Sequence, residues 1–222
     1  MAYYPIMVDL TGREVLVVGG GSVAARKIKT LLEYGAVINM VSKELSPEVK
    51  DYVDNGKVRY LGGEFSLVFL KNMFLVIAAT DDAELNRRIS KAAEEKGMLI
   101  NAVDQPADCN FIVPSIIKKG DLIVAVSTSG KSPALAKKIR KQLTEYFGEE
   151  HELFLRVMGK IRNDIIASGA DQKENSRIFH RIVDSELLET IKTRDFNKAA
   201  TILSGILGRD IPVNNIIDYT KE

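Results

Sequence analysis

The stretch Val15–Leu32, VLVVGGGSVAARKIKTLL, decides the fold of this chain. Four apolar residues predict a buried strand, three glycines follow directly, and a helical pattern then begins. Gly19, Gly21 and Ala24 match the G-x-G-x-x-G/A fingerprint of a dinucleotide site. The first glycine allows a tight turn, the second lets backbone approach a pyrophosphate, and the small third residue lets helix and strand pack closely. Such turns can also serve packing alone, but the flanking strand and helix favour cofactor binding.

Length and composition fit an ordinary globular protein of one or two domains. The 222 residues are 45% apolar and 27% charged, and the net charge of +1 predicts no nucleic-acid partner. The single cysteine, Cys109, excludes an intrachain disulfide, so we expect a cytoplasmic location. Its thiol is either a small buried group or part of a pocket wall. No apolar run reaches about 18 residues and the first residues lack an export signal, so we expect no membrane segment.

Apolar runs alternate with helical patterns over the first half of the chain. The predicted strands are 15–18, 37–41, 58–61, 73–79 and 98–103, and the predicted helices are 22–34, 47–55 and 81–96. The run at 73–79 is the most apolar and is expected inside the sheet, whereas 4–9 could form a short edge segment. This alternation predicts an α/β fold, a Rossmann-like parallel sheet with helices on both faces.

Small and polar residues gather where the predicted strands end, which is where such sheets bind ligands. The candidate cofactor-binding residues are Gly19, Gly21, Ser22, Val23, Lys43, Glu44, Thr80 and Asn101. An acidic residue for the ribose hydroxyls is expected about 20 residues after the glycines. Ser42 and Lys43 stand there instead, and Glu44 comes slightly late. Because Ser42 and Lys43 could tolerate a 2′-phosphate, the residues alone leave NAD and NADP both open.

The second half of the chain has a different pattern. Residues 111–117 and 122–127 predict a hairpin, and Ser132-Pro133 predicts the start of a helix that ends near residue 147. From residue 150 onward the pattern is helical, with a loop at 168–175 and a last helix near 196–207.

The segment AVSTSGKS, 125–132, is similar to a phosphate-binding P-loop. It lacks the first glycine of that motif, and no later strand ends in an acidic residue that could help to hold magnesium. A contact to an anionic or carboxylate ligand is the better interpretation. The candidate substrate-binding residues are Ser127, Thr128, Ser129 and Lys131.

Four motifs in series resemble the N-terminal family of siroheme synthases: VVGGGSVAARK, VIAATDDAELNRRIS, INAVDQPADCNFIVPSII and VAVSTSGKSPALAKKIR. The resemblance covers about residues 3–147. It implies a precorrin-2 dehydrogenase that uses NAD, with sirohydrochlorin ferrochelatase activity in some members. The chain is too short for the methyltransferase domain that other members carry, so we expect no methylation.

The resemblance also implies roles for residues. Its cofactor contacts fall on Ser22-Val23 and Lys43-Glu44, and its key carboxylate falls on Asp104. We hypothesise that Asp104 accepts the proton lost when the tetrapyrrole is oxidised. The alternative is a carboxylate that only caps the turn before Pro106.

The tetrapyrrole substrate is a polycarboxylate, for which Lys131, Lys137, Lys138 and Arg140 are candidate partners. Lys137, Lys138 and Arg140 could equally form a solvated helix face.

The resemblance implies a homodimer and three regions: an NAD-binding domain at 1–112, a dimerisation segment at 113–148 and a helical domain at 149–222. We predict no resident metal site, because His151 and His180 lack ligand spacing. Fe²⁺ or Co²⁺ as a substrate of metal insertion stays open. A regulatory domain that senses NAD without turnover is the alternative function.

Overall fold

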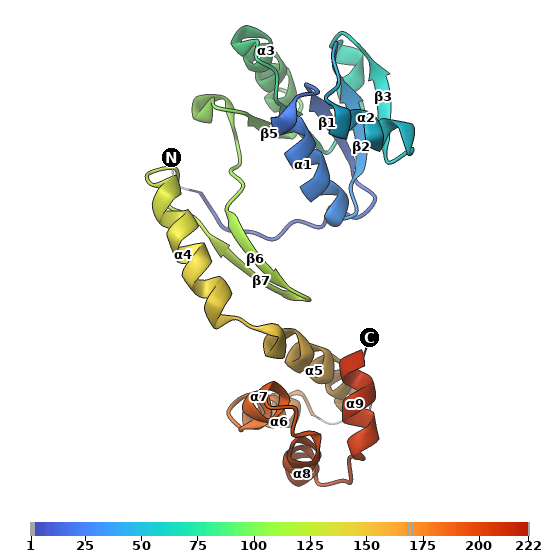
Figure 1. Cartoon of the computed structure of the whole chain (residues 1–222), viewed down its shortest axis with the longest axis vertical. Helices are drawn as coiled ribbons and strands as arrows, with labels where there is room; N and C mark the ends of the chain where they lie inside the picture. Colours follow the sequence, from blue (N-terminus) through green and yellow to red (C-terminus); the bar gives the residue numbers. More distant parts are fainter. Residues whose placement is uncertain (1–2, 168, 170, 222) are drawn as a thin grey trace. The chain divides into compact units, whose positions relative to one another are not determined.

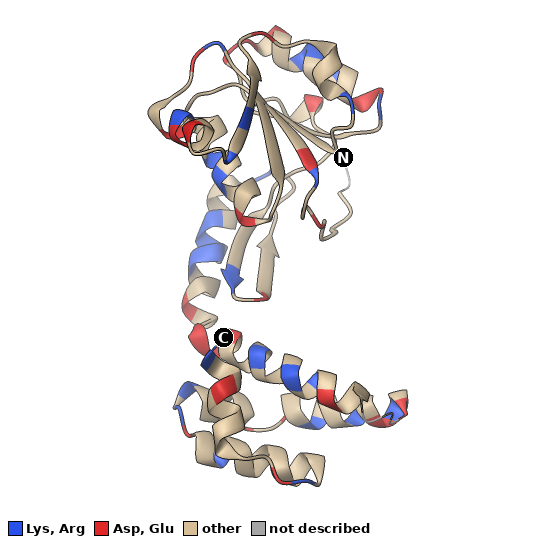
Figure 2. Ribbon diagram, turned by 90° about the vertical axis from the view of Figure 1, so that its right-hand side faces the viewer, with Lys and Arg blue, Asp and Glu red and all other residues tan. Residues whose placement is uncertain are grey.

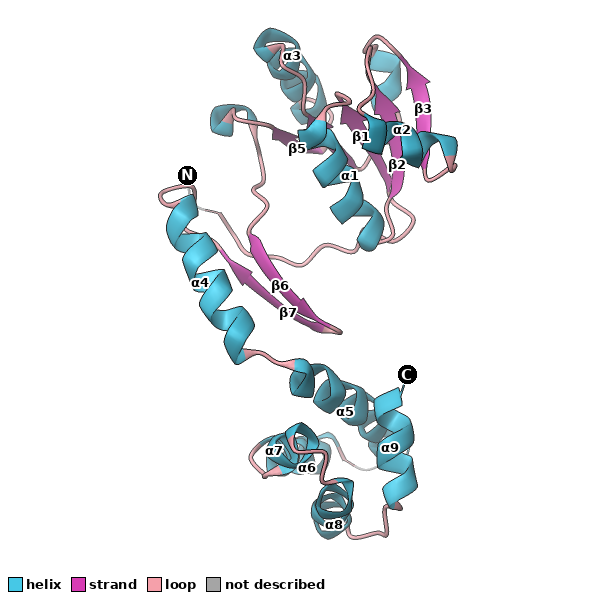
Figure 3. Cartoon of the chain, viewed as in Figure 1, coloured by secondary structure: helices cyan, strands magenta, loops and turns pink. Residues whose placement is uncertain are grey.

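The computed structural model describes residues 3–167, 169 and 171–221. The chain divides into two units, Met1–Val113 and Pro114–Glu222. The parallel sheet lies in the first unit, and a hairpin and a series of helices form the second (Figures 1 and 3). No helix among the described residues is long and apolar enough to cross a membrane.

The first unit contains a five-stranded, all-parallel sheet with the order β3-β2-β1-β4-β5. Its strands are β1 (Glu14–Val18), β2 (Val37–Val41), β3 (Val58–Gly62), β4 (Leu75–Ala78) and β5 (Leu99–Ala102). The most apolar run is β4, which lies between β1 and β5 as expected for a strand inside the sheet. The predicted Rossmann-like architecture is therefore confirmed.

Helices cover both faces of this sheet (Figure 3). They are α1 (Ser22–Glu33), α2 (Pro47–Asp54), α3 (Ala83–Glu94) and the short 3₁₀ segments η1 (Leu67–Leu70) and η2 (Pro106–Asp108). Alternate residues of β1 point to opposite faces. Val15 and Val17 therefore pack with α1 and α2, whereas Leu16 and Val18 pack with η1 and α3. The two helical layers bury both faces of the sheet. This packing fixes the positions of the strand ends.

One local expectation for the first unit is wrong, and one short element was not predicted. Residues 4–9 form no strand, and their apolar side chains Tyr4, Ile6 and Met7 are mainly exposed. Pro5 cannot donate to a strand ladder, which weakens an edge strand at this position. The η1 turn at Leu67–Leu70 was not predicted; Ser66 stands at its N-cap but makes no side-chain cap bond.

The second unit begins with an antiparallel hairpin, β6 (Ser115–Lys119) and β7 (Leu122–Val126). Lys119 pairs with Leu122, so the turn is the two residues Gly120 and Asp121, tighter than predicted. The hairpin packs against α4 (Pro133–Tyr146). Ser132 caps this helix as predicted, because its hydroxyl accepts a hydrogen bond from Leu135 N at 3.3 Å.

The rest of the second unit is helical, as predicted. Its helices are α5 (Glu149–Ala167), α6 (Gln172–Val183), α7 (Leu187–Lys192), α8 (Phe196–Leu207) and α9 (Val213–Lys221). The apolar residues at helical spacing form one core, which includes Val157, Ile161, Ile182 and Leu203.

Two boundaries in this region differ from expectation. The predicted loop 168–175 is wrong from Gln172 onward, where α6 already begins; residues 168 and 170 lie outside the described residues. The helix at 196–207 is not the last, because α9 follows and buries Ile216 in the same core. Both misjudged segments are polar apart from a few apolar positions, so their periodicity was weak.

Candidate functional site

The turns after four strands meet at one edge of the sheet, because all the strands are parallel. The backbone N–H of Gly19 donates to Val41 O at 2.9 Å, and that of Ala79 donates to Val18 O at 2.7 Å. Beyond them, Val103 N donates to the carbonyl of Ala78 at 2.9 Å. The predicted cofactor residues at the ends of β1, β2 and β4, and the turn that carries Asp104, therefore lie along a single edge.

The three glycines after β1 do different work. Gly19 has a φ of +116°, and a Cβ there would overlap the carbonyl oxygen of Ala79. A Cβ on Gly20 would overlap the carbonyl oxygen of Glu44. Gly20 is also bonded to the turn after β2, because Ser46 N donates to Gly20 O. A Cβ on Gly21 would meet no atom within 4 Å. The first two glycines thus allow close packing of the turns, and only Gly21 leaves its space open for a ligand.

Helix α1 starts beside that open space. Its N-cap is Gly21, whose backbone is extended and which supplies no side-chain cap, and its first turn contains no acidic residue. The N–H groups at the helix start are thus available to an anion, aided by the helix dipole. Ser22 is exposed and Val23 half-buried. Together with the open position at Gly21, this turn fits the pyrophosphate of a dinucleotide.

The turn after β2 presents its charged side chains to solvent. The Ser42 hydroxyl donates to Glu44 O at 2.6 Å, and the Tyr60 hydroxyl donates to Ser42 O at 2.9 Å, so the turn is held internally. Lys43 lies 3.7 Å from Glu64 in an exposed ion pair. An exposed pair of this kind is weak and can be replaced by a ligand. Lys43 and Glu44 are thereby free to contact the ribose end of a dinucleotide.

The turn after β4 depends on a residue that the sequence did not single out. The Thr80 hydroxyl donates to Asn86 Oδ1 at 2.7 Å, and Asn86 Nδ2 donates back to Thr80 O at 2.8 Å. Asn86 lies on α3 and is only 2% exposed. A polar residue on the buried face of an amphipathic helix was the available signal. Asn86 fixes the position of Thr80 at the sheet edge.

We expect Asn86→Ala to lower the free energy of unfolding by about 1–3 kcal/mol, because the half-buried N–H and C=O of Thr80 lose their side-chain partner. The Thr80 hydroxyl would keep only its bond to Asp82 O at 3.1 Å. Urea unfolding followed by circular dichroism measures this. Asn55→Ala removes an exposed amide at the end of α2 and serves as the matched control, with little expected change. Equal effects of the two substitutions would contradict this role for Asn86.

Asp104 stands in the turn after β5 and is exposed. Its φ is +58°, a left-handed conformation that few residues other than glycine adopt. Within the described residues its carboxylate makes no hydrogen bond or ion pair. By contrast, Asn101 lies within β5 itself, and its amide donates to Cys109 Sγ at 3.6 Å and to Phe111 O at 3.3 Å. Of these two predicted site residues, only Asp104 has its side chain free for a ligand.

The predicted substrate-binding residues belong to the second unit, in the loop between β7 and α4. Two of their hydroxyls hold the loop: Ser129 N donates to Ser127 Oγ and Ser132 N donates to Thr128 Oγ1, each at 3.1 Å. Ser129 has a φ of +51°. Lys131 is exposed, and its ammonium makes no ion pair within the described part of the chain. Lys131 is therefore the group in this loop that is free to bind an anion.

Basic residues continue along α4 (Figure 2). Lys137 and Lys138 are exposed and Arg140 is half-buried. Among the described residues none of these three has an ion-pair partner, so the positive charge of this helix is not neutralised locally. The arrangement suits a polyanionic ligand or solvent equally.

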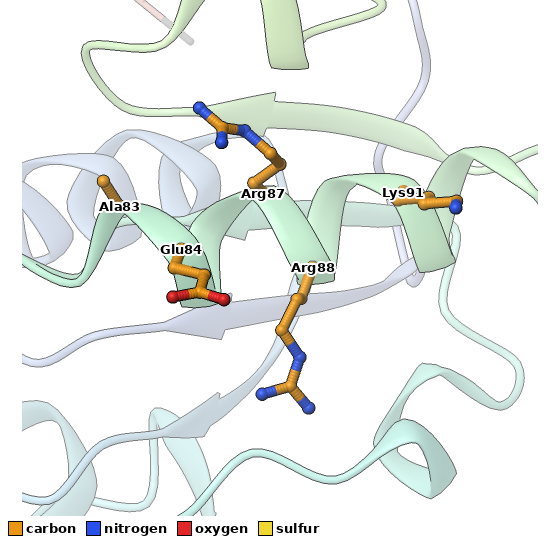
Figure 4. Close-up of a pocket in the computed structure, with 5 residues that line it drawn as sticks. All are labelled: Ala83, Glu84, Arg87, Arg88 and Lys91. Carbon is orange, nitrogen blue, oxygen red and sulfur yellow. The ribbon is translucent and has the colours of Figure 1, made fainter.

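A hollow of about 440 Å³ lies along α3 and is lined by Ala83, Glu84, Arg87, Arg88 and Lys91. Arg87 and Arg88 extend to opposite sides of the helix (Figure 4), and Arg87 lies 3.6 Å from Asp108. The hollow contains none of the predicted site residues. No group of three or more histidine, cysteine or acidic residues within 3–167, 169 and 171–221 is placed to hold a metal ion.

Comparison with known proteins gives matches to two family models. Residues 6–115 match the model described as "Putative NAD(P)-binding", and residues 119–146 match "Sirohaem biosynthesis protein central". The first match agrees with the geometry of the glycine turn and supports the predicted nicotinamide dinucleotide cofactor, NAD or NADP.

Curated relatives and a solved structure point the same way. A siroheme synthase of Actinobacillus succinogenes is 36% identical over 95% of this chain and 44% of its own length. A siroheme synthase of Sodalis glossinidius is 47% identical over 64% of this chain and 30% of its own length. The structure of SirC, a precorrin-2 dehydrogenase, superimposes with a TM-score of 0.77 and 28% identity, covering 93% of this chain and all of that one.

The chain spans less than half the length of the siroheme synthases that it matches, and the matched part is their N-terminal region. The two family models match 6–115 and 119–146, which is the part of the chain that contains the four motifs. The chain therefore belongs to the family formed by the N-terminal region of the siroheme synthases.

Proposed function

We propose that this protein is an NAD-dependent precorrin-2 dehydrogenase, which oxidises precorrin-2 to sirohydrochlorin in siroheme biosynthesis. The observation that carries the proposal is Asp104: an exposed carboxylate without a partner among the described residues, at the same sheet edge as the open glycine turn. The likeness to a precorrin-2 dehydrogenase structure over nearly the whole chain supports the same activity.

The reaction removes a hydride and a proton from the reduced tetrapyrrole. Bound NAD supplies the hydride acceptor. The turns after β1 and β2 would hold the pyrophosphate and a ribose, with the nicotinamide end directed toward β4 and β5. Asp104 would accept the proton. Its alternative role as a turn cap has no support, because its carboxylate bonds to no backbone N–H among the described residues.

The decisive test is NADH formation from precorrin-2 and NAD, followed at the absorbance of NADH with sirohydrochlorin measured in parallel. Equimolar appearance of both products is the expected result. Binding of NAD without any NADH production would favour the alternative, a domain that senses the cofactor without catalysis. No binding of NAD would contradict both functions.

The substrate is a polycarboxylate, and we assign Lys131 to one of its carboxylates, with Lys137, Lys138 and Arg140 as further candidates. We expect Lys131→Ala to raise KM for precorrin-2 by about three- to tenfold at low salt, with a smaller effect at high salt, because the lost contact is electrostatic. Steady-state kinetics at two ionic strengths measures this. An unchanged KM at both salt concentrations would remove Lys131 from the substrate site.

The dimer belongs to the proposal as well. Residues 113–148 would form the dimerisation segment between an NAD-binding domain, 1–112, and a helical domain, 149–222. A two-stranded hairpin is marginal on its own. The apolar residues Ile116, Ile123 and Val124 are only half-buried in β6 and β7, which supports a further partner surface. Light scattering of the purified chain tests for a homodimer.

Metal insertion into sirohydrochlorin is a separate activity, with Fe²⁺ or Co²⁺ as substrate. His151 lies beside Glu150, and His180 lies on α6. Both histidines belong to the second unit, whereas the glycine turn belongs to the first. The absorbance change of sirohydrochlorin on addition of Co²⁺ tests for this activity.

The free thiol of Cys109 suits the reducing cytoplasm, where we place the reaction.

A further inference from the structure

The thiol of Cys109 joins the two ends of the turn that carries Asp104. This thiol lies 3.2 Å from Ala102 O, two residues before Asp104, and 3.3 Å from Gln105 O, one residue after it. It also accepts hydrogen bonds from Ala102 N at 3.2 Å and Asn101 Nδ2 at 3.6 Å. The single thiol therefore contacts the chain both before and after Asp104.

Cys109 contacts the outer edge of β5, the last strand of the sheet. Among the described strands β5 pairs only with β4, so its outer edge has no neighbouring strand there. The chain returns after η2 and covers this edge. Asn110 bonds to the middle of β5, through its backbone N–H to Ile100 O at 3.1 Å and through its side chain to Ile100 N at 2.9 Å. Cys109 bonds to Ala102, the last residue of β5.

The thiol is suited to this task. Burial raises the pKa of Cys109, so its proton stays in place at neutral pH and can be donated to Ala102 O or Gln105 O. Cys109 packs with the α3 side of the sheet, among residues such as Ile100 and Ala102. A protonated, half-buried thiol is a small apolar group that can also make weak hydrogen bonds.

The turn needs such support because Asp104 holds a left-handed conformation, with a φ of +58°. Within the turn itself, Gln105 N donates to Ala102 O at a long 3.4 Å. The remaining bonds lie at its two ends: Val103 N donates to Ala78 O at 2.9 Å, Asp108 N donates to Gln105 O at 3.0 Å, and Gln105 Nε2 donates to Ala83 O at 3.2 Å. The carboxylate itself contributes nothing to the turn. A strained residue at a functional position persists only when its surroundings fix it.

We infer that Cys109 is a positioning residue, which holds the carboxylate of Asp104 in place for proton transfer through the contacts of its thiol on both sides of the turn. The inference rests on the proposed dehydrogenase function. It predicts that Cys109 matters for turnover only while Asp104 is present, whereas a purely structural residue would affect the protein in either background.

A double-mutant cycle tests this in the full chain with precorrin-2 and NAD. We expect Cys109→Ala to lower kcat about 10- to 100-fold, as small misplacements of reacting groups do, with unchanged affinity for NAD. In the Asp104→Asn background, Cys109→Ala should lower kcat no further. Rates in that background are measured in single turnovers with enzyme in excess, so that low activity can still be followed.

Two further variants complete the design. Cys109→Ser keeps a donor and should recover part of the lost kcat. Asn110→Ala removes a tie to the middle of β5 and is the matched control: it should lower stability but keep kcat near wild type. Hydrogen exchange of the 103–105 amides should become faster in Cys109→Ala and stay unchanged in Asn110→Ala, which gives a readout independent of activity.

Equal losses from Cys109→Ala in both backgrounds, or an unchanged kcat in the single variant, would overturn the inference. A wild-type chain that forms no NADH would instead overturn the proposed function, and Asp104→Asn with wild-type turnover would overturn the role of the carboxylate. These failures are distinguishable because each appears in a different member of the cycle. If Cys109→Ala does not fold, Cys109→Ser and its own double variant give the same comparison.

Discussion

Replacing Asp104 with Asn lowers kcat for precorrin-2 oxidation by about 10²- to 10⁴-fold, the range expected for loss of a general base. The amide has nearly the same size but accepts no proton. The Asp104 carboxylate is exposed and bonds to no other group among the described residues, so the substitution breaks no native contact. Affinity for NAD and the free energy of unfolding should therefore stay close to wild type.

Three measurements separate a chemical role from a structural one: steady-state kinetics, NAD titration by calorimetry, and urea unfolding. Asp54→Asn is the matched control, since Asp54 is also exposed but lies at the end of α2, and it should leave all three quantities unchanged. If Asp104→Asn turned over precorrin-2 at the wild-type rate with NAD bound normally, the base would have to be another group or solvent.

The sheet was predictable because its signals are local. Each buried strand is a short apolar run between turn residues, and both faces of the sheet are covered, so the runs are nearly continuous. Ser132-Pro133 marked the start of α4 because the capping chemistry is contained in two adjacent residues. The glycine turn was predictable for the same reason, and Gly19 does need a conformation with positive φ.

The support of the site was not predictable, because it depends on side-chain contacts across loops, made by residues that are ordinary in type. Asn86 reaches Thr80 across six positions, and Cys109 reaches Ala102 across seven. The Cys109 contact leaves no pattern in the sequence, and Asn86 is marked only as a polar residue on the apolar face of a helix. Cys109 was expected to be either buried or part of a pocket wall, but it is a hydrogen-bonding group at a strand edge. Likewise, no sequence signal indicates that Asp104 has a positive φ.

The glycine turn also allows a sharp comparison of one substitution at two positions. Gly19→Ser should destabilise the first unit by at least about 1–3 kcal/mol through backbone strain at φ +116° alone. The added Cβ would also overlap Ala79 O, and that segment cannot retreat easily because Ala79 N is bonded to Val18 O. Loss of NAD binding in this variant would follow from loss of structure.

Gly21→Ser should behave differently, because its Cβ meets no protein atom within 4 Å and its extended backbone suits serine. Serine is also a good N-cap, so we expect stability within about 0.5 kcal/mol of wild type or slightly higher. The new hydroxyl would occupy the space for the pyrophosphate and compete for the N–H groups of α1. We therefore expect the Kd for NAD to rise at least about tenfold, which corresponds to about 1.4 kcal/mol.

Urea unfolding and NAD titration of both variants give the comparison. A folded Gly21→Ser that binds NAD with wild-type affinity would show that the cofactor does not lie over this turn, and a Gly21→Ser as unstable as Gly19→Ser would show that the glycine serves packing. The expected pattern, in which stability is lost at one glycine and affinity at the other, follows only if the turn both packs against β4 and cradles an anion. That is the physical meaning of a fingerprint whose glycines are two residues apart.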